Sequence, residues 1–217
     1  MGKLKQYFIL NEDRSEYGLL EGAEKLPAKP ALSFSNKEFV KIDHSGMTPA
    51  GQEVPHSLFE RSIPTKSWGY IIGRYLEHPI YQYQVYGIAQ EGKFQALAVV
   101  RRSSFNGQHA LRVVDLIGPW EALEGTYHLW QGLLKSHQAQ YLDLYCLDTQ
   151  DFNLEAAGFL LRDKYPEVIV PNYFEPFEKR NVNLHYSYKI SSGERYSFFK
   201  GDCDQDRPNF ISQEASA

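Results

Sequence analysis

The stretch ALRVVDLIGPWEALEGTYHLWQGLLKSHQAQYLDLYC, residues 110–146, decides the fold of this chain. Its two ends, residues 110–118 and 139–146, are short apolar runs of the length expected for strands. Between them an apolar stripe repeats at helical spacing: Leu123, Tyr127, Trp130 and Leu134. A helix that joins two strands in this way is a crossover, so we expect the strands to be parallel neighbours or near neighbours in one sheet.

Upstream of this stretch, the sequence predicts an antiparallel meander. Residues 81–89 alternate as a strand does, and the turn signals EGK at 91–93 and NGQ at 106–108 separate the runs that follow. Three strands are therefore expected before the crossover. A helix capped by Thr65 is predicted ahead of them, over residues 65–79.

The crossover helix contains Gly125, which would cost about 1 kcal/mol in a helix interior. We therefore expect the helix to begin near Thr126. Downstream of the crossover, a short helix is predicted between Thr149 and Gly158. A strand is expected in PEVIVPN, residues 166–172, and a closing hairpin turns at 191–194. The fold class is mixed α/β (α+β), with a central mixed sheet, an antiparallel beginning and a helix crossover.

Size and composition favour one globular domain. The chain has 217 residues, of which 42% are hydrophobic, enough to bury a substantial core. Residues 1–64 are rich in Pro, Gly and Ser, which punctuate loops, and we interpret them as an appended or wrapping segment. Residues 65–209 form the predicted domain, and residues 210–217 are expected to be a flexible tail.

Charge and cysteine content exclude several classes of protein. The formal charge is -4 without a basic stripe, which argues against nucleic-acid binding. Cys146 and Cys203 are too few for a disulfide framework or a cysteine-built zinc site, and the seven histidines lack zinc-binding spacing. No apolar run reaches the roughly 20 residues of a membrane span. We expect a cytoplasmic protein with a small-molecule or sugar ligand, and a homo-oligomer stays open.

The order of these elements resembles the GNAT acyltransferase superfamily. The resemblance rests on ALRVVDLIG, a helix, YLDLYC, a helix with AAGF, and then VIVPNYF, and it covers residues from about 65 to 200. The ending KGDCDQDRPN also resembles a D-G-D-Q-D-R-P-N pattern of GNAT-like proteins in bacterial surface-polysaccharide pathways, with Cys203 in place of Gly. The resemblance implies an acyl-CoA donor.

One departure from that superfamily concerns the phosphate loop. Its members carry an Arg or Gln followed by closely spaced glycines at the start of the central helix, where backbone N–H groups hold the pyrophosphate of acyl-CoA. Here the segment reads IGPWEALEGTY, with Gly118 and Gly125 far apart and no basic residue. This loop does not predict ordinary coenzyme A binding.

Polar residues on one predicted strand suggest a cleft. Alternation places Tyr141, Asp143 and Tyr145 on one face of strand 139–146, and a polar face on a central strand suggests access to water. The resemblance implies that Tyr145 or Tyr141 returns a proton to the leaving thiolate. The alternative is that both rings pack in the core and their hydroxyls find ordinary partners.

Asp115 is the candidate general base. By alternation it shares a face with apolar neighbours such as Val113 and Ile117, which would raise its pKa and let it accept a proton from an attacking amine. The alternative is a buried structural carboxylate with a backbone, Arg or Tyr partner.

Asp143 on the polar face and two further groups are candidates for substrate binding. Asn172 and Glu175 could bind sugar hydroxyls, or they could simply belong to a proline-bracketed turn. The C-terminal cluster could bind a substrate amine or a local metal ion; its residues are Asp202, Asp204, Asp206 and Arg207. The alternative is a charged hinge in which Arg207 neutralises the aspartates. The cluster lacks the Gly and the twelfth-position Glu of an EF-hand, so that loop is excluded.

Two functions are consistent with these features. The first is an N-acyltransferase that moves an acyl group from a thioester to the amine of an amino sugar or nucleotide-linked sugar. The second is a catalytically inactive GNAT-like binding or assembly module of a polysaccharide pathway. Their discriminating feature is whether Asp115, Tyr141 and Tyr145 line one open cleft or lie buried separately.

Overall fold

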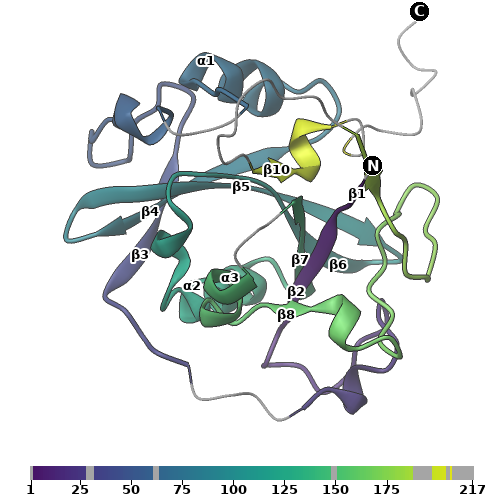
Figure 1. Ribbon diagram of the computed structural model, residues 1–217. Coiled ribbons are helices and arrows are strands. Elements are labelled where there is room, and N and C mark those ends of the chain that lie inside the picture. Colours follow the sequence, from purple (N-terminus) through teal and green to yellow (C-terminus); the bar gives the residue numbers. More distant parts are fainter. Residues whose placement is uncertain are drawn as a thin grey trace, which may run out of the picture.

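A mixed sheet of eight strands forms the centre of the molecule (Figure 1). The computed structural model describes residues 2–27, 32–60, 64–147, 151–187, 197–203 and 206. The strand order is β3-β4-β5-β6-β7-β2-β8, and β10 pairs with β7 outside this path. The strands are β2 (Lys5–Leu10), β3 (Lys37–Ile42), β4 (Tyr83–Gln90), β5 (Lys93–Phe105), β6 (Gln108–Ile117), β7 (Ala139–Leu147), β8 (Leu160–Leu161) and β10 (Phe198–Phe199).

The predicted meander and crossover are confirmed. Strands β4, β5 and β6 pair antiparallel in sequence, and β6 pairs parallel with β7. The turns at Glu91-Gly92 and Asn106-Gly107 have positive φ at both residues, which fits the right-handed twist of a hairpin. The crossover runs through η4 (Trp120–Leu123) and α2 (Tyr127–Ser136), so the helix begins directly after Thr126, as predicted.

The first 60 residues contribute to the same sheet. Strand β2 lies between β7 and β8, and β3 forms the edge beside β4. The sheet therefore contains strands from both sides of the boundary predicted at residue 64. The short elements of this region are β1 (Gly2–Lys3), η1 (Ala23–Lys25) and η2 (His56–Leu58).

Two predictions for the C-terminal third of the chain are wrong: a strand over residues 166–172 and a closing hairpin. Residues 166–172 form only an isolated bridge, from Ile169 to Glu21, because β2 already occupies the position beside β7. The closing hairpin is replaced by β9 (His185–Tyr186), which pairs with β1, and β10, which pairs with β7. The predicted turn at 191–194 lies outside the described residues, as does the predicted cap Thr149.

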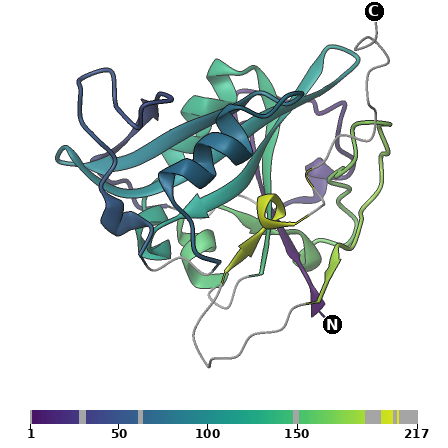
Figure 2. The ribbon, with the colours of Figure 1, turned by 90° about the horizontal axis from the view of Figure 1, so that it is seen from above.

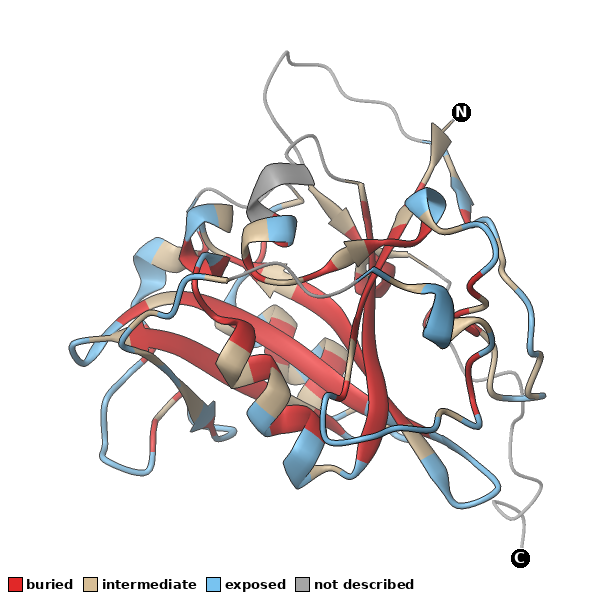
Figure 3. Cartoon of the chain, turned by 90° about the horizontal axis from the view of Figure 1, so that it is seen from below, coloured by how far each residue is buried: buried red, intermediate tan, exposed pale blue. Residues whose placement is uncertain are grey.

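Helices and an irregular segment cover the two faces of the sheet. One face carries α2 and α3 (Asp151–Ala156). The other carries α1 (Trp68–Ile71), continued by the π-helical η3 (Ile72–Leu76), which lies across β4, β5 and β6 (Figure 2). Beside it, residues 165–184, which begin after η5 (Arg162–Lys164), pack over β7 and β2. The strands are therefore buried from both sides (Figure 3).

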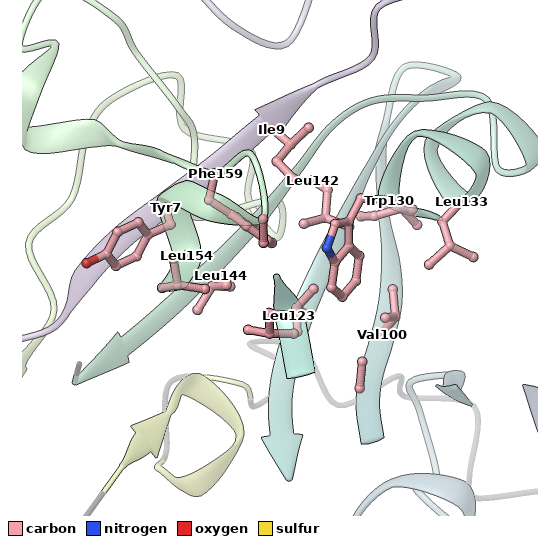
Figure 4. Packing of buried hydrophobic residues seen from close by; sticks show 14 of the residues in the cluster. Tyr7, Ile9, Val100, Leu123, Trp130, Leu133, Leu142, Leu144, Leu154 and Phe159 are labelled. Atoms are coloured by element: carbon pink, nitrogen blue, oxygen red, sulfur yellow. The ribbon is translucent and has the colours of Figure 1, made fainter. Parts of the chain in front are cut away.

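The largest core cluster lies between the sheet and α2. The predicted helical stripe is buried there, with Trp130 at 0% exposure against Leu142 and Val100 (Figure 4). Phe159 packs edge-on against Trp130, with ring centroids 5.6 Å apart. Among the described residues, no helix is long and apolar enough to cross a membrane.

The core cluster predicts a contrast between two phenylalanines. Phe159 is 1% exposed and Phe34 is 76% exposed. Replacing Phe159 by Ala should leave a cavity and lower the free energy of unfolding by about 3–5 kcal/mol. Phe34→Ala should change it by less than about 0.5 kcal/mol. Equal effects in urea unfolding would contradict the packing described.

Candidate functional site

The C-terminal segment, residues 198–203 with Asp206, lies where β6 and β7 diverge. The last partners of the parallel pair are Val113 and Leu144, although both strands continue beyond them. Beyond this point β10 pairs with β7, at Leu147 and Cys146, and leads into η6 (Lys200–Asp202). Strand β10 thus pairs with the part of β7 that β6 leaves unpaired where the two strands diverge.

The segment fits tightly against β6 and η3. A Cβ on Gly201 would lie 2.8 Å from the Val114 carbonyl oxygen and 2.2 Å from the Tyr75 hydroxyl oxygen, so glycine is the residue that this approach allows. Arg74 donates two hydrogen bonds to the Gly201 carbonyl. Phe199 is 2% exposed and stacks on Trp120, with centroids 5.4 Å apart.

A β-bulge turns Asp115 toward α1. Val99 pairs with Asp115 and Val100 pairs with Val113, so the β6 residue between them is extra. Strict alternation is therefore interrupted, and the prediction that Asp115 shares a face with Val113 is wrong. Val113 packs under α2, whereas Asp115 points to the opposite face, toward Tyr75 of η3.

Asp115 belongs to a buried ion-pair cluster around Lys66. The Lys66 Nζ lies 2.5 Å from Asp115 Oδ1 and 3.0 Å from Asp202 Oδ1. The Tyr75 hydroxyl donates to the other Asp115 oxygen at 2.9 Å, and the Phe199 N–H donates to Asp202 at 3.0 Å. The side chains of Lys66 and Asp202 are 3% and 1% exposed, so both charges depend on these partners.

The pKa values of this cluster follow from burial and from the opposite charges. Burial raises the pKa of Asp115 to about 6, against the lowering effect of Lys66. Burial alone would lower the pKa of Lys66, but Asp115 and Asp202 raise it above its ordinary value. Burial and the Asp115 charge raise the pKa of Tyr75, which stays a hydrogen-bond donor.

Asp206 anchors the segment at a second point. Two Arg101 nitrogens donate to Asp206 Oδ1, at 2.7 and 3.0 Å, and Tyr83 donates to Oδ2 at 2.5 Å. The Tyr81 ring covers the guanidinium, whose carbon lies 4.0 Å from the ring centroid. Burial raises the pKa of Asp206, but Arg101 and Lys200 outweigh it and lower the value to about 2.

The predicted polar face of β7 is buried and does not line an open cleft. Tyr141, Asp143 and Tyr145 do share a face, but each is at most 1% exposed, because residues 165–184 lie over them. Tyr141 donates to the Pro171 carbonyl at 2.9 Å, and Tyr145 lies 3.5 Å from the Val182 carbonyl. Asp143 accepts a hydrogen bond from Gln6 and lies 3.8 Å from Arg112.

Asn172 joins two buried cationic side chains. Its Oδ1 accepts from Arg112 Nη1 and from Lys200 Nζ, each at 2.9 Å. Burial and the neighbouring Arg112 hold the pKa of Lys200 well below its ordinary value. Glu175, by contrast, is exposed and accepts a hydrogen bond from the Tyr81 hydroxyl at 2.7 Å.

The structure therefore brings together only part of the predicted site. Asp115 and Asp202 share Lys66, whereas Tyr141, Tyr145 and Asp143 lie under a different segment, and Asp204 and Arg207 fall outside the described residues. Sequence reasoning missed the basic partners: Lys66, Arg101, Arg112 and Lys200. Arg112 and Arg101 carried a weak signal, since each interrupts or ends an apolar strand.

No protein-family model matches the chain, and a search of curated proteins gives no match either. The described part of the chain contains no group of three His, Cys, Asp or Glu side chains that could hold a metal ion.

The Asp206 anchor predicts a loss of stability in acid. Its pKa is about 2 in the folded chain against 3.8 ordinarily, so its contribution is present above about pH 4 and is lost as the pH falls toward 2. That contribution is about 2 kcal/mol. The difference in unfolding free energy between the wild type and Asp206→Asn should therefore shrink by this amount between about pH 5 and 2.

The control for this experiment is Glu16→Gln, since Glu16 is exposed and forms no ion pair with another described residue. Its stability relative to the wild type should stay nearly constant over the same range. A constant difference for Asp206→Asn would show that the carboxylate is not bound as described.

Proposed function

We propose that this chain is a catalytically inactive GNAT-like binding or assembly module of a polysaccharide pathway. The strand order supports the GNAT-like part, because an antiparallel meander leads through a helix crossover into a parallel pair that diverges. The resemblance of the ending KGDCDQDRPN supports the pathway.

The observation that carries the proposal is the position of β10. In acyl transfer by this chain, backbone N–H groups of β6 would hold the oxyanion, and Tyr145 of β7 would protonate the thiolate as the resemblance implies. The thioester would then lie between these strands where they diverge. Phe199 pairs with Cys146 in that place and is 2% exposed. A thioester could bind there only if β10 first separated from β7.

The burial of the catalytic candidates agrees with this proposal. Asp115 is 0% exposed and neutralised by Lys66, while Tyr141 and Tyr145 face carbonyls of another segment. The three side chains do not line one cleft. Such separate burial is expected of a chain that does not catalyse acyl transfer.

The second candidate function is an N-acyltransferase, and one observation favours it. Asp115 lies just beyond the last β6–β7 partner, Val113, and its pKa of about 6 suits a proton acceptor at neutral pH. For acyl transfer to occur, the C-terminal segment would have to move away from β6 and β7. That movement would expose Phe199, at a cost of about 1.5–3 kcal/mol, in addition to separating two buried ion pairs.

A thermal-shift titration distinguishes the two functions. With acetyl-CoA and longer acyl-CoAs we expect no saturable rise in melting temperature, because the donor position is filled. A donor present at about 100 times its dissociation constant would stabilise the chain by about 2.7 kcal/mol, which a melting curve resolves easily.

A saturable shift would contradict the module and favour the enzyme. In that case Asp115→Asn should abolish acyl transfer to an amino sugar while the shift with acyl-CoA persists. Phe199→Ala serves as a companion variant, since loosening the segment should strengthen acyl-CoA binding only if the donor position is real.

A further inference from the structure

A cavity of about 470 Å³ lies beyond the C-terminal end of α2, away from the ion-pair cluster of Lys66. Residues from the start of β4, the end of β5 and the residue after α2 line it, among them Tyr81, Gln84, Arg102, Ser104 and His137. Its volume lies within the range of about 300–1,000 Å³ that is usual for small-molecule sites.

Positive charge gathers around this cavity without a matching carboxylate. Arg102 is exposed in the cavity wall, and none of the described residues forms an ion pair with it. Lys41 of β3 does not line the cavity, but its charge acts on His137, which does. The described lining residues include neither Asp nor Glu. Arg101 also contributes to the lining, but its guanidinium is already bound by Asp206.

The pKa of His137 reflects the same positive charge around the cavity. Burial lowers its pKa, and the charges of Arg102 and Lys41 lower it further. The C-terminal end of α2 contributes about half a negative charge, which is less than the two full charges of Arg102 and Lys41. An anion in the cavity would relieve this repulsion.

Neutral polar groups lie beside these charges. Gln82, Gln84 and Ser104 offer amides and a hydroxyl. The Tyr81 ring does not face these groups, because it stacks on Arg101 on the opposite face of the sheet. Amides and a hydroxyl suit a ligand with several hydroxyl groups.

We propose that this cavity binds a phosphoryl group carried by a small hydroxyl-rich molecule, such as a sugar phosphate. Arg102 contacts the phosphoryl oxygens, His137 donates a ring N–H to them, and the charge of Lys41 adds to the positive potential. The amides of Gln82 and Gln84 hydrogen-bond the hydroxyl groups. This site does not depend on whether the chain transfers acyl groups.

Isothermal titration with three probes tests the proposal: a hexose 6-phosphate, the parent hexose and inorganic phosphate. The hexose phosphate should bind at one site per chain, more tightly than either fragment. Arg102→Gln should weaken it by about tenfold or more, since a charge-assisted contact is lost. Lys93→Gln removes the same charge from the first residue of β5, at the end of the strand far from the cavity, and should leave the affinity unchanged.

Histidine ring resonances provide a second readout on the same protein. Saturation with hexose phosphate should raise the pKa of His137, while the ring signals of the distant, exposed His56 should not move. Three results would overturn the proposal: no binding of hexose phosphate, equal weakening by Arg102→Gln and Lys93→Gln, or equal affinity for hexose phosphate and inorganic phosphate.

Discussion

The contact of Lys66 with two carboxylates is the interaction on which the candidate site depends. Lys66 lies in the chain just before α1. Its ammonium group links Asp115 of β6 to Asp202 of η6 and so holds the C-terminal segment against the sheet. All three side chains are at most 3% exposed. Removing one partner from such a buried group typically costs about 3–5 kcal/mol, because a charge is then left without compensation. The segment is therefore part of the folded core.

This anchoring determines what the diverging strands can do. A gap between two parallel strands offers unpaired backbone groups, which a ligand or another strand can satisfy. Here β10 satisfies them on β7, and Gly201 allows the chain to pass close to Val114. In the function that we propose, the same contacts that stabilise the fold fill the place where a thioester would lie. Ligand binding is then expected elsewhere, and the basic cavity beyond α2 has the polar groups for it.

Sequence reasoning predicted the parts of the fold that depend on local pattern. The crossover over residues 110–146 and both hairpin turns follow from periodicity and turn chemistry. The bulge at Asp115 could not be predicted, because β6 is apolar on both faces, so the shift that one extra residue makes in the alternation does not show in the sequence. The partners of the acidic cluster were hidden for another reason: Lys66 and Asp202 are separated by 136 residues. Lys41, Arg102 and His137 likewise meet only in the folded chain, so no basic stripe marks their cavity.

The C-terminal segment is a fixed part of the sheet, and amide hydrogen exchange measures this most directly. The amides of residues 198–202 should exchange nearly as slowly as those of β7, through openings close to global unfolding. In Lys66→Met these amides should lose protection while β7 keeps it. Fast exchange at residues 198–202 in the wild type, as in an exposed loop, would contradict this. The space between β6 and β7 would then be accessible to a ligand.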